Sequence, residues 1–297
     1  MTTDNIRLPD LTNINSPSET LAEIKKILQL IDPSFSSTFI ENVYEDIIRL
    51  FNGDYPGYRA SNTKYHNLEH TCAVTLATAR LTHGVHVQGR KFSFRVVRLG
   101  LIGALFHDTG LIQTDDENNG TGAKHTIGHE ERSIALMREY LSDKKISEED
   151  MLDCSHIIQC TILDLSTSKI PFRSEEIEIM GKILGSADLS AQMADRNYLE
   201  KLPLLFLEFE EAGMEGFETP LELFKNTEEF YHSVARTRMV EELDNVASAY
   251  LHHFQSRWQI DRDLYAEAIK NNINYMREAT IDCTDSYECL MSKLRRK

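Results

Sequence analysis

Apolar residues recur every three or four positions through most of this chain, and the strict alternation typical of half-buried strands is absent. The first such stretch follows Ser16, a helix-capping residue, with Pro17 at the first helical position and Glu19 three residues after the cap. The same periodicity predicts further helices at about 39–51, 65–83, 92–106, 128–141, 147–162, 174–190, 196–212, 219–230, 232–257 and 261–280. The pattern therefore predicts an all-α fold.

Two polar stretches interrupt the helical pattern. Residues 53–64 are rich in Gly, Pro, Ser and Asn, and residues 113–124, QTDDENNGTGAK, form the most polar segment, so both are expected to be loops. No repeat of fixed period and no low-complexity linker divides the chain. We expect one helical domain, in which an N-terminal helical segment (1–60) packs on a core (61–215) that C-terminal helices (216–297) complete.

The composition is that of an ordinary globular protein, with 41% hydrophobic and 27% charged residues among 297. A net charge of -15 disfavours contact with a phosphate backbone, so we expect no nucleic acid polymer as a partner. A small anionic substrate stays compatible with this charge, because a bound divalent cation reverses the local sign of the field.

The chain shows no secretory signal, and its longest apolar run, Leu99–Phe106, is far shorter than the roughly 18 residues of a membrane span. We therefore expect a cytoplasmic protein with no membrane partner. Five cysteines form no C-x-x-C pair, and their odd number suits reduced thiols better than a disulfide framework or a zinc knuckle.

The first candidate for chemistry is the stretch LFHDTGLI, residues 105–112, in which His107 and Asp108 end an apolar run. An imidazole and a carboxylate lose water there, and that loss is costly unless both groups find partners. A metal ion would take the imidazole nitrogen and a carboxylate oxygen as ligands. The alternative is a buried histidine hydrogen-bonded to its neighbour.

Two more histidines, His66 and His70, stand four residues apart in the predicted helix 65–83. At about 100° per residue they project from one face, about 40° apart, so both imidazoles can reach one site. The alternative is a pair of exposed or capping histidines.

Three further residues could contribute to the same site. Asp188 follows an apolar helical run and is either a ligand or a solvated carboxylate at a helix end. His129 stands four residues after His125, and His156 is a lone histidine on an apolar helix, where a satisfied core residue is the alternative. Imidazole and carboxylate ligands without thiolate suit Zn, Mn, Fe or Ni, with Mg or Mn at an oxygen-rich neighbour. Too few protein ligands for a closed shell would leave positions for water and substrate, as in catalytic metal sites.

Three motifs then carry a family resemblance. YHNLEH, residues 65–70, resembles the signature of the catalytic domain of cyclic-nucleotide phosphodiesterases. Together with FHDTG (106–110) and SADLS (186–190), it resembles the wider HD-domain superfamily of metal-dependent phosphohydrolases, over about residues 65–213. The resemblance implies an all-α, HD-domain or PDEase-like helical bundle with two divalent metal ions, drawn from Zn, Mn, Fe, Ni and Mg.

The resemblance also implies residue roles. The first metal would lie on His70, His107, Asp108 and Asp188, and Asp108 would share a bridging water with a second metal. His66 matches the first histidine of the phosphodiesterase signature and would be the general acid, so His66 and Asp108 are the expected catalytic residues. His129 and His156 are the candidates for the second metal.

The chain departs from the phosphodiesterase pattern where that family binds purines. The glutamine that grips the base falls on Ala212, beside Glu211, and an alanine cannot make that bidentate hydrogen bond. The glutamate that orients the acidic histidine falls on Leu136, and the second histidine of the His-Asp-x-x-His motif falls on Leu111. The substrate-binding residues are therefore not predicted.

The sequence thus predicts a metal-dependent phosphohydrolase whose metal-activated water cleaves a small anionic phosphoester, with a cyclic-nucleotide-like phosphodiester favoured. The alternatives are a nucleotide phosphomonoesterase, a metal-containing module that senses a ligand without turnover, and a structural helical protein with incidental histidines.

Overall fold

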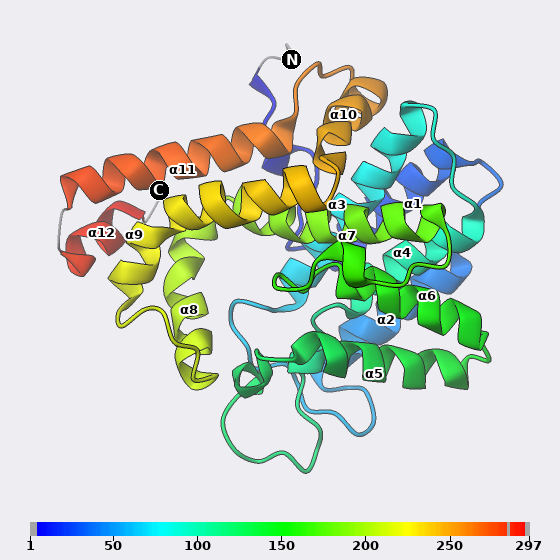
Figure 1. The fold of residues 1–297 in the computed structure, drawn as a ribbon, viewed down its shortest axis with the longest axis horizontal. Coiled ribbons are helices and arrows are strands. Elements are labelled where there is room, and N and C mark those ends of the chain that lie inside the picture. Colours follow the sequence, from blue (N-terminus) through cyan, green and yellow to red (C-terminus); the bar gives the residue numbers. More distant parts are fainter. Residues whose placement is uncertain (1–4, 284–285, 295–297) are drawn as a thin grey trace.

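The computed structural model describes residues 5–283 and 286–294, and it confirms the all-α prediction (Figure 1). Within these ranges no strand forms, and one isolated antiparallel bridge joins Tyr58 to Thr114, between the two predicted loops. The α-helices are α1 (Pro17–Ile31), α2 (Thr38–Asn52), α3 (Leu68–Val87), α4 (Phe94–Phe106), α5 (His129–Asp143), α6 (Glu148–Gln159), α7 (Glu175–Ala194), α8 (Tyr198–Glu211), α9 (Pro220–Phe230), α10 (Tyr250–Trp258), α11 (Leu264–Asp282) and α12 (Tyr287–Leu294).

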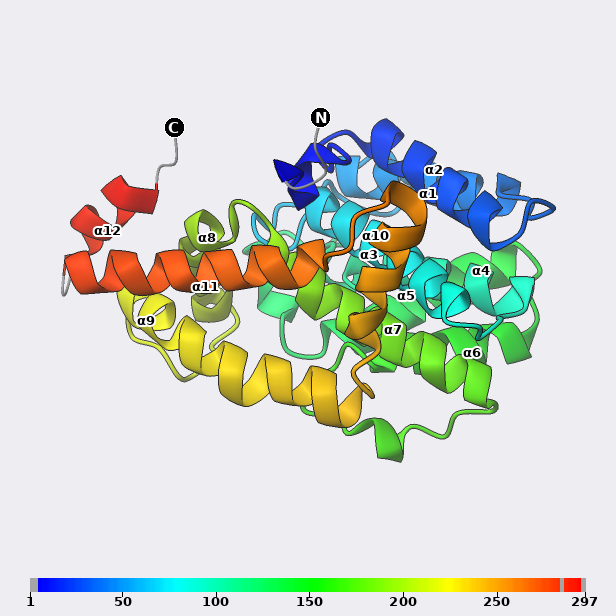
Figure 2. The same ribbon diagram turned by 90° about the horizontal axis from the view of Figure 1, so that it is seen from above.

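Helices α3 and α7 form the centre of the molecule and pack against each other. α3 also contacts α1, α4 and α10, whereas α7 also contacts α4, α6 and α11. Both central helices are buried over most of their length, as expected for helices that are apolar on nearly every face. Figure 2 shows α1 and α2 on one side of this centre, and α9 with its continuation on the other.

The buried apolar side chains of these helices form one continuous cluster, to which residues from α1 through α12 contribute. The predicted boundaries at 60/61 and 215/216 remain predictions. None of the helices in the described ranges is long and apolar enough to cross a membrane.

Local signals place the first helix where the sequence predicts it. The Ser16 hydroxyl accepts a hydrogen bond from the Glu19 backbone N–H, and Pro17 opens α1. The predicted helix from residue 65 instead begins at Leu68, because the Asn67 side chain caps α3 by accepting from the His70 N–H. His66 therefore lies in the bend before α3 and does not share its helical face with His70.

The predicted helix 232–257 is also corrected. α9 continues through π-helical turns at Tyr231–Ala235 and Arg238–Glu242, and the chain then breaks before a 3-10 turn, Val246–Ala249, that leads into α10. Asp244 and Asn245 have φ of +51° and +52° at the break, a left-handed conformation that Asn and Asp tolerate better than most residues.

The expectation that all five cysteines are reduced is wrong for one pair. Cys283 and Cys289 form a disulfide that joins the end of α11 to α12, with their Cα atoms 5.5 Å apart. The two cysteines are six residues apart in the chain. Cys72, Cys154 and Cys160 are free and buried.

Candidate metal centre

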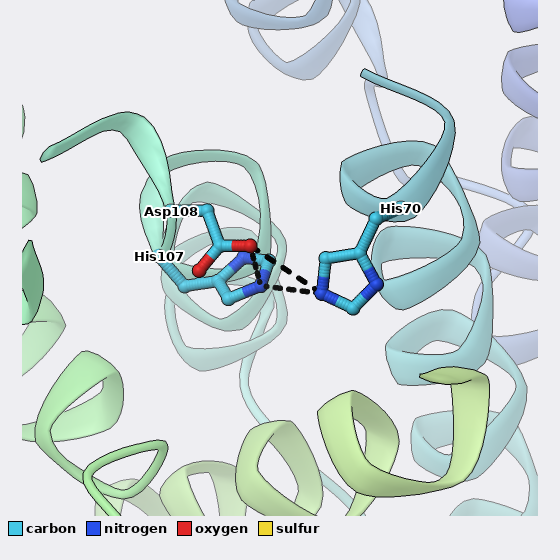
Figure 3. A group of neighbouring side chains, drawn as sticks. All are labelled: His70, His107 and Asp108. Atoms are coloured by element: carbon cyan, nitrogen blue, oxygen red, sulfur yellow. Dashed lines mark hydrogen bonds and ion pairs between the residues drawn. The ribbon is translucent and has the colours of Figure 1, made fainter. Parts of the chain in front are cut away.

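A buried group of ligand atoms lies where the start of α3 meets the end of α4 (Figure 3). His70 comes from the first turn of α3, and His107 and Asp108 directly follow α4. The His70 and His107 Nε2 atoms are 3.4 Å apart, and Asp108 Oδ2 is 3.4 Å from the first and 3.2 Å from the second. One ligand atom from each residue lies within 4.8 Å of the others, so this group could bind a metal ion.

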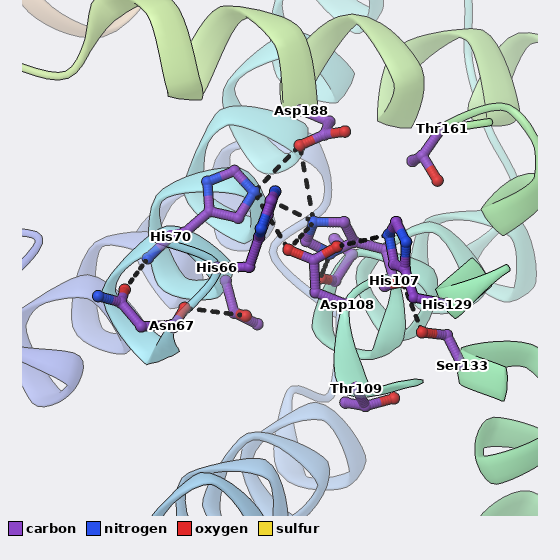
Figure 4. Close-up of polar contacts among 12 residues, drawn as sticks. His66, Asn67, His70, His107, Asp108, Thr109, His129, Ser133, Thr161 and Asp188 are labelled. Carbon is purple, nitrogen blue, oxygen red and sulfur yellow. Dashed lines mark hydrogen bonds and ion pairs between the residues drawn. The ribbon is translucent and has the colours of Figure 1, made fainter. Parts of the chain in front are cut away.

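Asp188 extends this group from α7, two thirds of the way along that helix (Figure 4). Its Oδ1 lies 3.1 Å from His70 Nε2 and 3.6 Å from His107 Nε2. The sequence-predicted residues for a first metal are thus brought together from two helices, α3 and α7, and the turn after α4.

The tautomer of His107 shows that this group needs a positive charge. Its Nδ1–H donates to the Ala104 carbonyl at 2.8 Å, so in the neutral ring Nε2 carries a lone pair. That nitrogen faces oxygens of Asp108 and Asp188, and the buried Asp108 Oδ2 makes no hydrogen bond within the described chain. Lone pairs facing one another in a buried site repel unless a proton or a metal ion lies between them.

Without a metal, protons meet this need. Burial lowers the pKa of His107, but the adjacent Asp108 carboxylate outweighs burial and raises that pKa well above its ordinary value. Burial raises the pKa of Asp188, but its hydrogen bonds with the two imidazoles outweigh burial and hold that pKa below its usual range. A divalent cation would supply the same charge, and an imidazole that donates its other N–H to a carbonyl is the usual arrangement for a metal ligand.

The turn that carries His107 and Asp108 is held against α5. The Ser133 hydroxyl donates to the His107 carbonyl at 2.6 Å and accepts from the Gly110 N–H at 2.8 Å. A Cβ atom at Gly110 would lie 2.0 Å from the His129 carbonyl oxygen, so the turn can approach α5 this closely only with glycine there. The FHDTG motif therefore encodes a docking position as well as two ligands.

His129, the first residue of α5, approaches Asp108 from the opposite side. Its Nδ1–H donates to the Thr126 carbonyl at 2.8 Å, and its Nε2 lies 3.3 Å from Asp108 Oδ1. Burial lowers the pKa of His129, but the hydrogen bond and charge of Asp108 outweigh it and raise that pKa to about 9. Asp108 thus turns Oδ2 toward His70 and His107 and Oδ1 toward His129.

His156 lies apart from this cluster. It is buried on α6 with its ring edge-on to Phe172, 6.2 Å between centroids, and its Nδ1 has no hydrogen-bond partner within the described chain. Its described contacts include no carboxylate, so the geometry gives no support to its predicted role in a second metal site. His125 pairs with Glu117 at 2.6 Å, also outside the cluster.

A glutamate that the sequence did not predict orients His66 beside the cluster. Glu208 on α8 lies with Oε2 2.7 Å from His66 Nδ1, and its Oε1 accepts the backbone N–H groups of Lys64 and Tyr65 at 2.8 and 2.7 Å. The predicted position of this glutamate, Leu136, is instead a core residue of α5. A single acid on the buried side of the predicted helix 196–212 was the available signal.

The His66 ring lies close to both halves of the cluster, with its centroid 5.8 Å from that of His70 and 6.2 Å from that of His129. Burial lowers the pKa of His66, but the hydrogen bond to Glu208 and the Asp108 charge outweigh it, so the pKa lies above its ordinary value. With Nδ1 bound to Glu208, Nε2 is the nitrogen left to exchange a proton with a bound molecule.

A model of the Npun_R2479-like family matches residues 23–274, which include all of the residues of this cluster. The family's description names no activity. The chain has no match among curated proteins.

Proposed function

We propose a function for a chain that belongs to the Npun_R2479-like family: hydrolysis of a phosphoester bond at a divalent metal centre. One observation carries the proposal. The His107 Nε2 lone pair and oxygens of Asp108 and Asp188 converge with His70 in a buried site that needs a cation. The resemblance to HD-domain phosphohydrolases supports the same reaction and remains part of the proposal.

The residues present fit such a centre. His70, His107, Asp108 and Asp188 would hold one metal ion, and Asp108 with His129 would contribute to a second. Nitrogen and oxygen ligands of this kind suit first-row divalent metals. Bound there, divalent ions polarise phosphoryl oxygens and lower the pKa of water.

His66 is the proposed general acid. Glu208 fixes its ring through Nδ1 and raises its pKa, so that Nε2 can carry a proton near neutral pH. Protonation of the departing oxygen lowers the barrier to its release. Asp108 is the proposed second catalytic residue, because its two oxygens reach both halves of the cluster.

The proposed substrate is a small anionic phosphoester, with a nucleotide phosphodiester favoured over a phosphomonoester by the resemblance. The position of the purine-gripping glutamine is Ala212, and the neighbouring Glu211 carboxylate accepts from the Thr121 backbone N–H and hydroxyl. Ala212 has no polar side chain and the Glu211 carboxylate is already hydrogen-bonded, so we expect little discrimination among bases at this position.

Metal analysis tests the centre. We expect at least one transition metal ion per chain in the purified protein, and loss of that metal in Asp108→Ala. His125→Ala is the control, because His125 is a half-buried histidine that pairs with Glu117 outside the cluster. Less than one metal ion per chain, or full metal content in Asp108→Ala, would contradict the proposal.

A panel of cyclic nucleotides, dinucleotides and phosphomonoesters, assayed with Mn²⁺ or Ni²⁺, tests the reaction. We expect turnover that a chelator abolishes. Binding of a nucleotide without turnover would favour the ligand-sensing alternative.

His66→Ala tests the acid. We expect normal metal content and a loss of turnover on the order of 10²–10⁴-fold, the usual contribution of a general acid. Unchanged turnover would remove His66 from the mechanism.

A further inference from the structure

Lys201 of α8 lies between two carboxylates that belong to two other helices. Its Nζ is 2.8 Å from Glu69 Oε1, at the start of α3, and 2.6 Å from Asp195 Oδ2, at the end of α7. The predicted chemistry does not use any of these three residues.

Each helix in this contact also carries either a residue of the candidate metal centre or, in α8, the glutamate that orients His66. Glu69 directly precedes His70, and Asp195 ends the helix that carries Asp188. Lys201 and Glu208 stand seven residues apart on α8, almost two full turns, and so project from the same side of that helix. One ammonium group therefore joins the three helices that position His70, Asp188 and the Glu208–His66 pair.

The contact lies close to His70 of the candidate metal centre. Lys201, Glu69 and Asp195 line a small cavity of about 20 Å³ together with His70. Asn272 of α11 fixes the end of α7 there by donating to the carbonyls of Met193 and Asp195, at 2.9 and 2.8 Å. A displacement of Glu69 or Asp195 would therefore shift the position of His70.

Burial makes the loss of one partner of this contact more costly than in a surface ion pair. The side chains of Lys201, Glu69 and Asp195 are 17%, 25% and 13% exposed. Burial lowers the pKa of Lys201, but the charges of Asp195 and Glu69 and the hydrogen bonds to them together outweigh burial and raise that pKa, so the ammonium stays charged. Removing the ammonium would leave two half-buried carboxylates facing each other across α3 and α7, and such unpaired like charges repel.

We propose that Lys201 is a positioning residue, which sets the spacing of α3, α7 and α8 so that His70, Asp188 and His66 converge on one metal centre. The inference rests on the metal centre of the proposed function and does not depend on the identity of the substrate.

Cobalt binding tests the proposal on the full chain, by the visible absorption of Co²⁺ titrated at pH 7. In Lys201→Met we expect a Kd for Co²⁺ roughly 10–100-fold higher, the usual cost of losing a residue that supports metal ligands, and a changed Co²⁺ spectrum. Lys201→Arg keeps the charge, and we expect it to restore most of the affinity and the wild-type spectrum.

Lys182→Met is the matched control. Lys182 also bridges two carboxylates, Glu178 and Asp244, each at 2.7 Å, and its side chain is only 9% exposed. Glu178 lies in the first turn of α7, and Asp244 follows the second π-helical turn. Neither residue is next to a proposed metal ligand, so Lys182→Met should lower thermal stability without changing the Co²⁺ spectrum. An equal loss of Co²⁺ affinity in Lys182→Met and Lys201→Met would overturn the proposal, and so would wild-type binding by Lys201→Met.

If circular dichroism shows that Lys201→Met is unfolded, Glu69→Gln tests the same contact. This variant keeps the pair of Lys201 with Asp195, so we expect a smaller rise in the Kd for Co²⁺ together with a changed Co²⁺ spectrum. An unchanged spectrum and an unchanged Kd would overturn the proposal.

Failure of the wild-type protein to bind Co²⁺ would overturn both this proposal and the metal centre. Co²⁺ binding without any phosphoester turnover would overturn the phosphohydrolase assignment alone.

Discussion

At the residue scale, Glu208 shows how one buried carboxylate can serve both structure and chemistry. One oxygen accepts two backbone N–H groups of residues 64 and 65, and the other binds His66 Nδ1. The backbone contacts fix the segment that carries His66, and the third contact fixes the orientation and the protonation of its ring. A buried acid with both oxygens engaged in this way is a strong constraint on the site.

Glu208→Gln should therefore affect rate and pH dependence together. We expect kcat to fall roughly 10–100-fold, as for other residues that orient a catalytic histidine or ligand. Because Glu208 raises the pKa of His66, its loss lowers that pKa. The acid must be protonated to act, so the basic limb of the kcat–pH profile should move to lower pH.

Glu210→Gln is the control for that measurement, since Glu210 is an exposed acid on the same helix. Its pH profile should match that of the wild type. A Glu208→Gln profile with an unmoved basic limb would show that His66 is not the titrating acid.

At the element scale, the close approach of the FHDTG turn to α5 decides whether Asp108 can reach His129. The site of Gly110 has space for a hydrogen atom but not for a Cβ atom, because a Cβ there would lie 2.0 Å from the His129 carbonyl oxygen and 2.7 Å from the Ser133 backbone nitrogen. These are backbone atoms of a helix, so they cannot move aside as the end of a flexible side chain can. The glycine thus determines the distance between two elements.

Gly110→Ala should separate the turn from α5. We expect a loss of about 1–3 kcal/mol in the free energy of unfolding, as for other overpacked sites, measured by urea denaturation. Gly103→Ala is the control, because its nearest neighbours are the methyl groups of Ile157 and Leu184 at 3.0 and 3.3 Å, which can shift. Equal losses in the two variants would show that the backbone contact at Gly110 is not special.

The interrupted segment after α9 has an element-scale role as well. Arg238, in its second π-helical turn, donates to the carbonyls of Cys160, Ile162, Leu163 and Leu165. Cys160 directly follows the last residue of α6, and the other three lie in the segment beyond it, so the arginine fixes that segment and the end of the helix from another part of the chain. The π-helical turns and the left-handed break at Asp244 and Asn245 therefore replace the regular helix predicted for 232–257.

At the scale of the whole molecule, the candidate centre couples folding to the charge of buried groups. Three helices and one turn supply its ligands, so the charge that balances Asp108 and Asp188 also holds these elements together. Protons supply the charge in the metal-free protein, and a metal ion would replace them. The two forms should therefore differ in how their stability depends on pH.

The metal-free protein should lose stability as pH rises from about 6.5 to about 9. The folded-state pKa of His129 is raised to about 9, above its ordinary value of 6.5, so its contribution is fully present below 6.5 and is lost as pH passes through 9. Metal binding requires deprotonated ligands, so added Mn²⁺ should raise Tm most at the upper end of this range.

Thermal unfolding at pH 6, 7, 8 and 9, with chelator and with Mn²⁺, measures this dependence. His129→Gln is the control, and its metal-free form should show a weaker fall in Tm over the same range. A metal-free wild-type Tm that does not fall more steeply than that of His129→Gln would contradict the assignment of this proton to His129.

The sequence by itself determined the all-α class, most helix positions and four of the residues that meet at the centre, His70, His107, Asp108 and Asp188. Caps such as Ser16, helical periodicity and the motifs around His70, His107 and Asp188 depend on neighbours within a few residues, which a sequence displays directly. Only the tertiary structure paired His66 with Glu208, 142 residues away, joined Lys201 to two other helices, left His156 apart and formed the Cys283–Cys289 disulfide. Periodicity gives the apolar face of each helix, but the faces that meet, and the polar side chains buried between them, are set by how all the helices pack into one core.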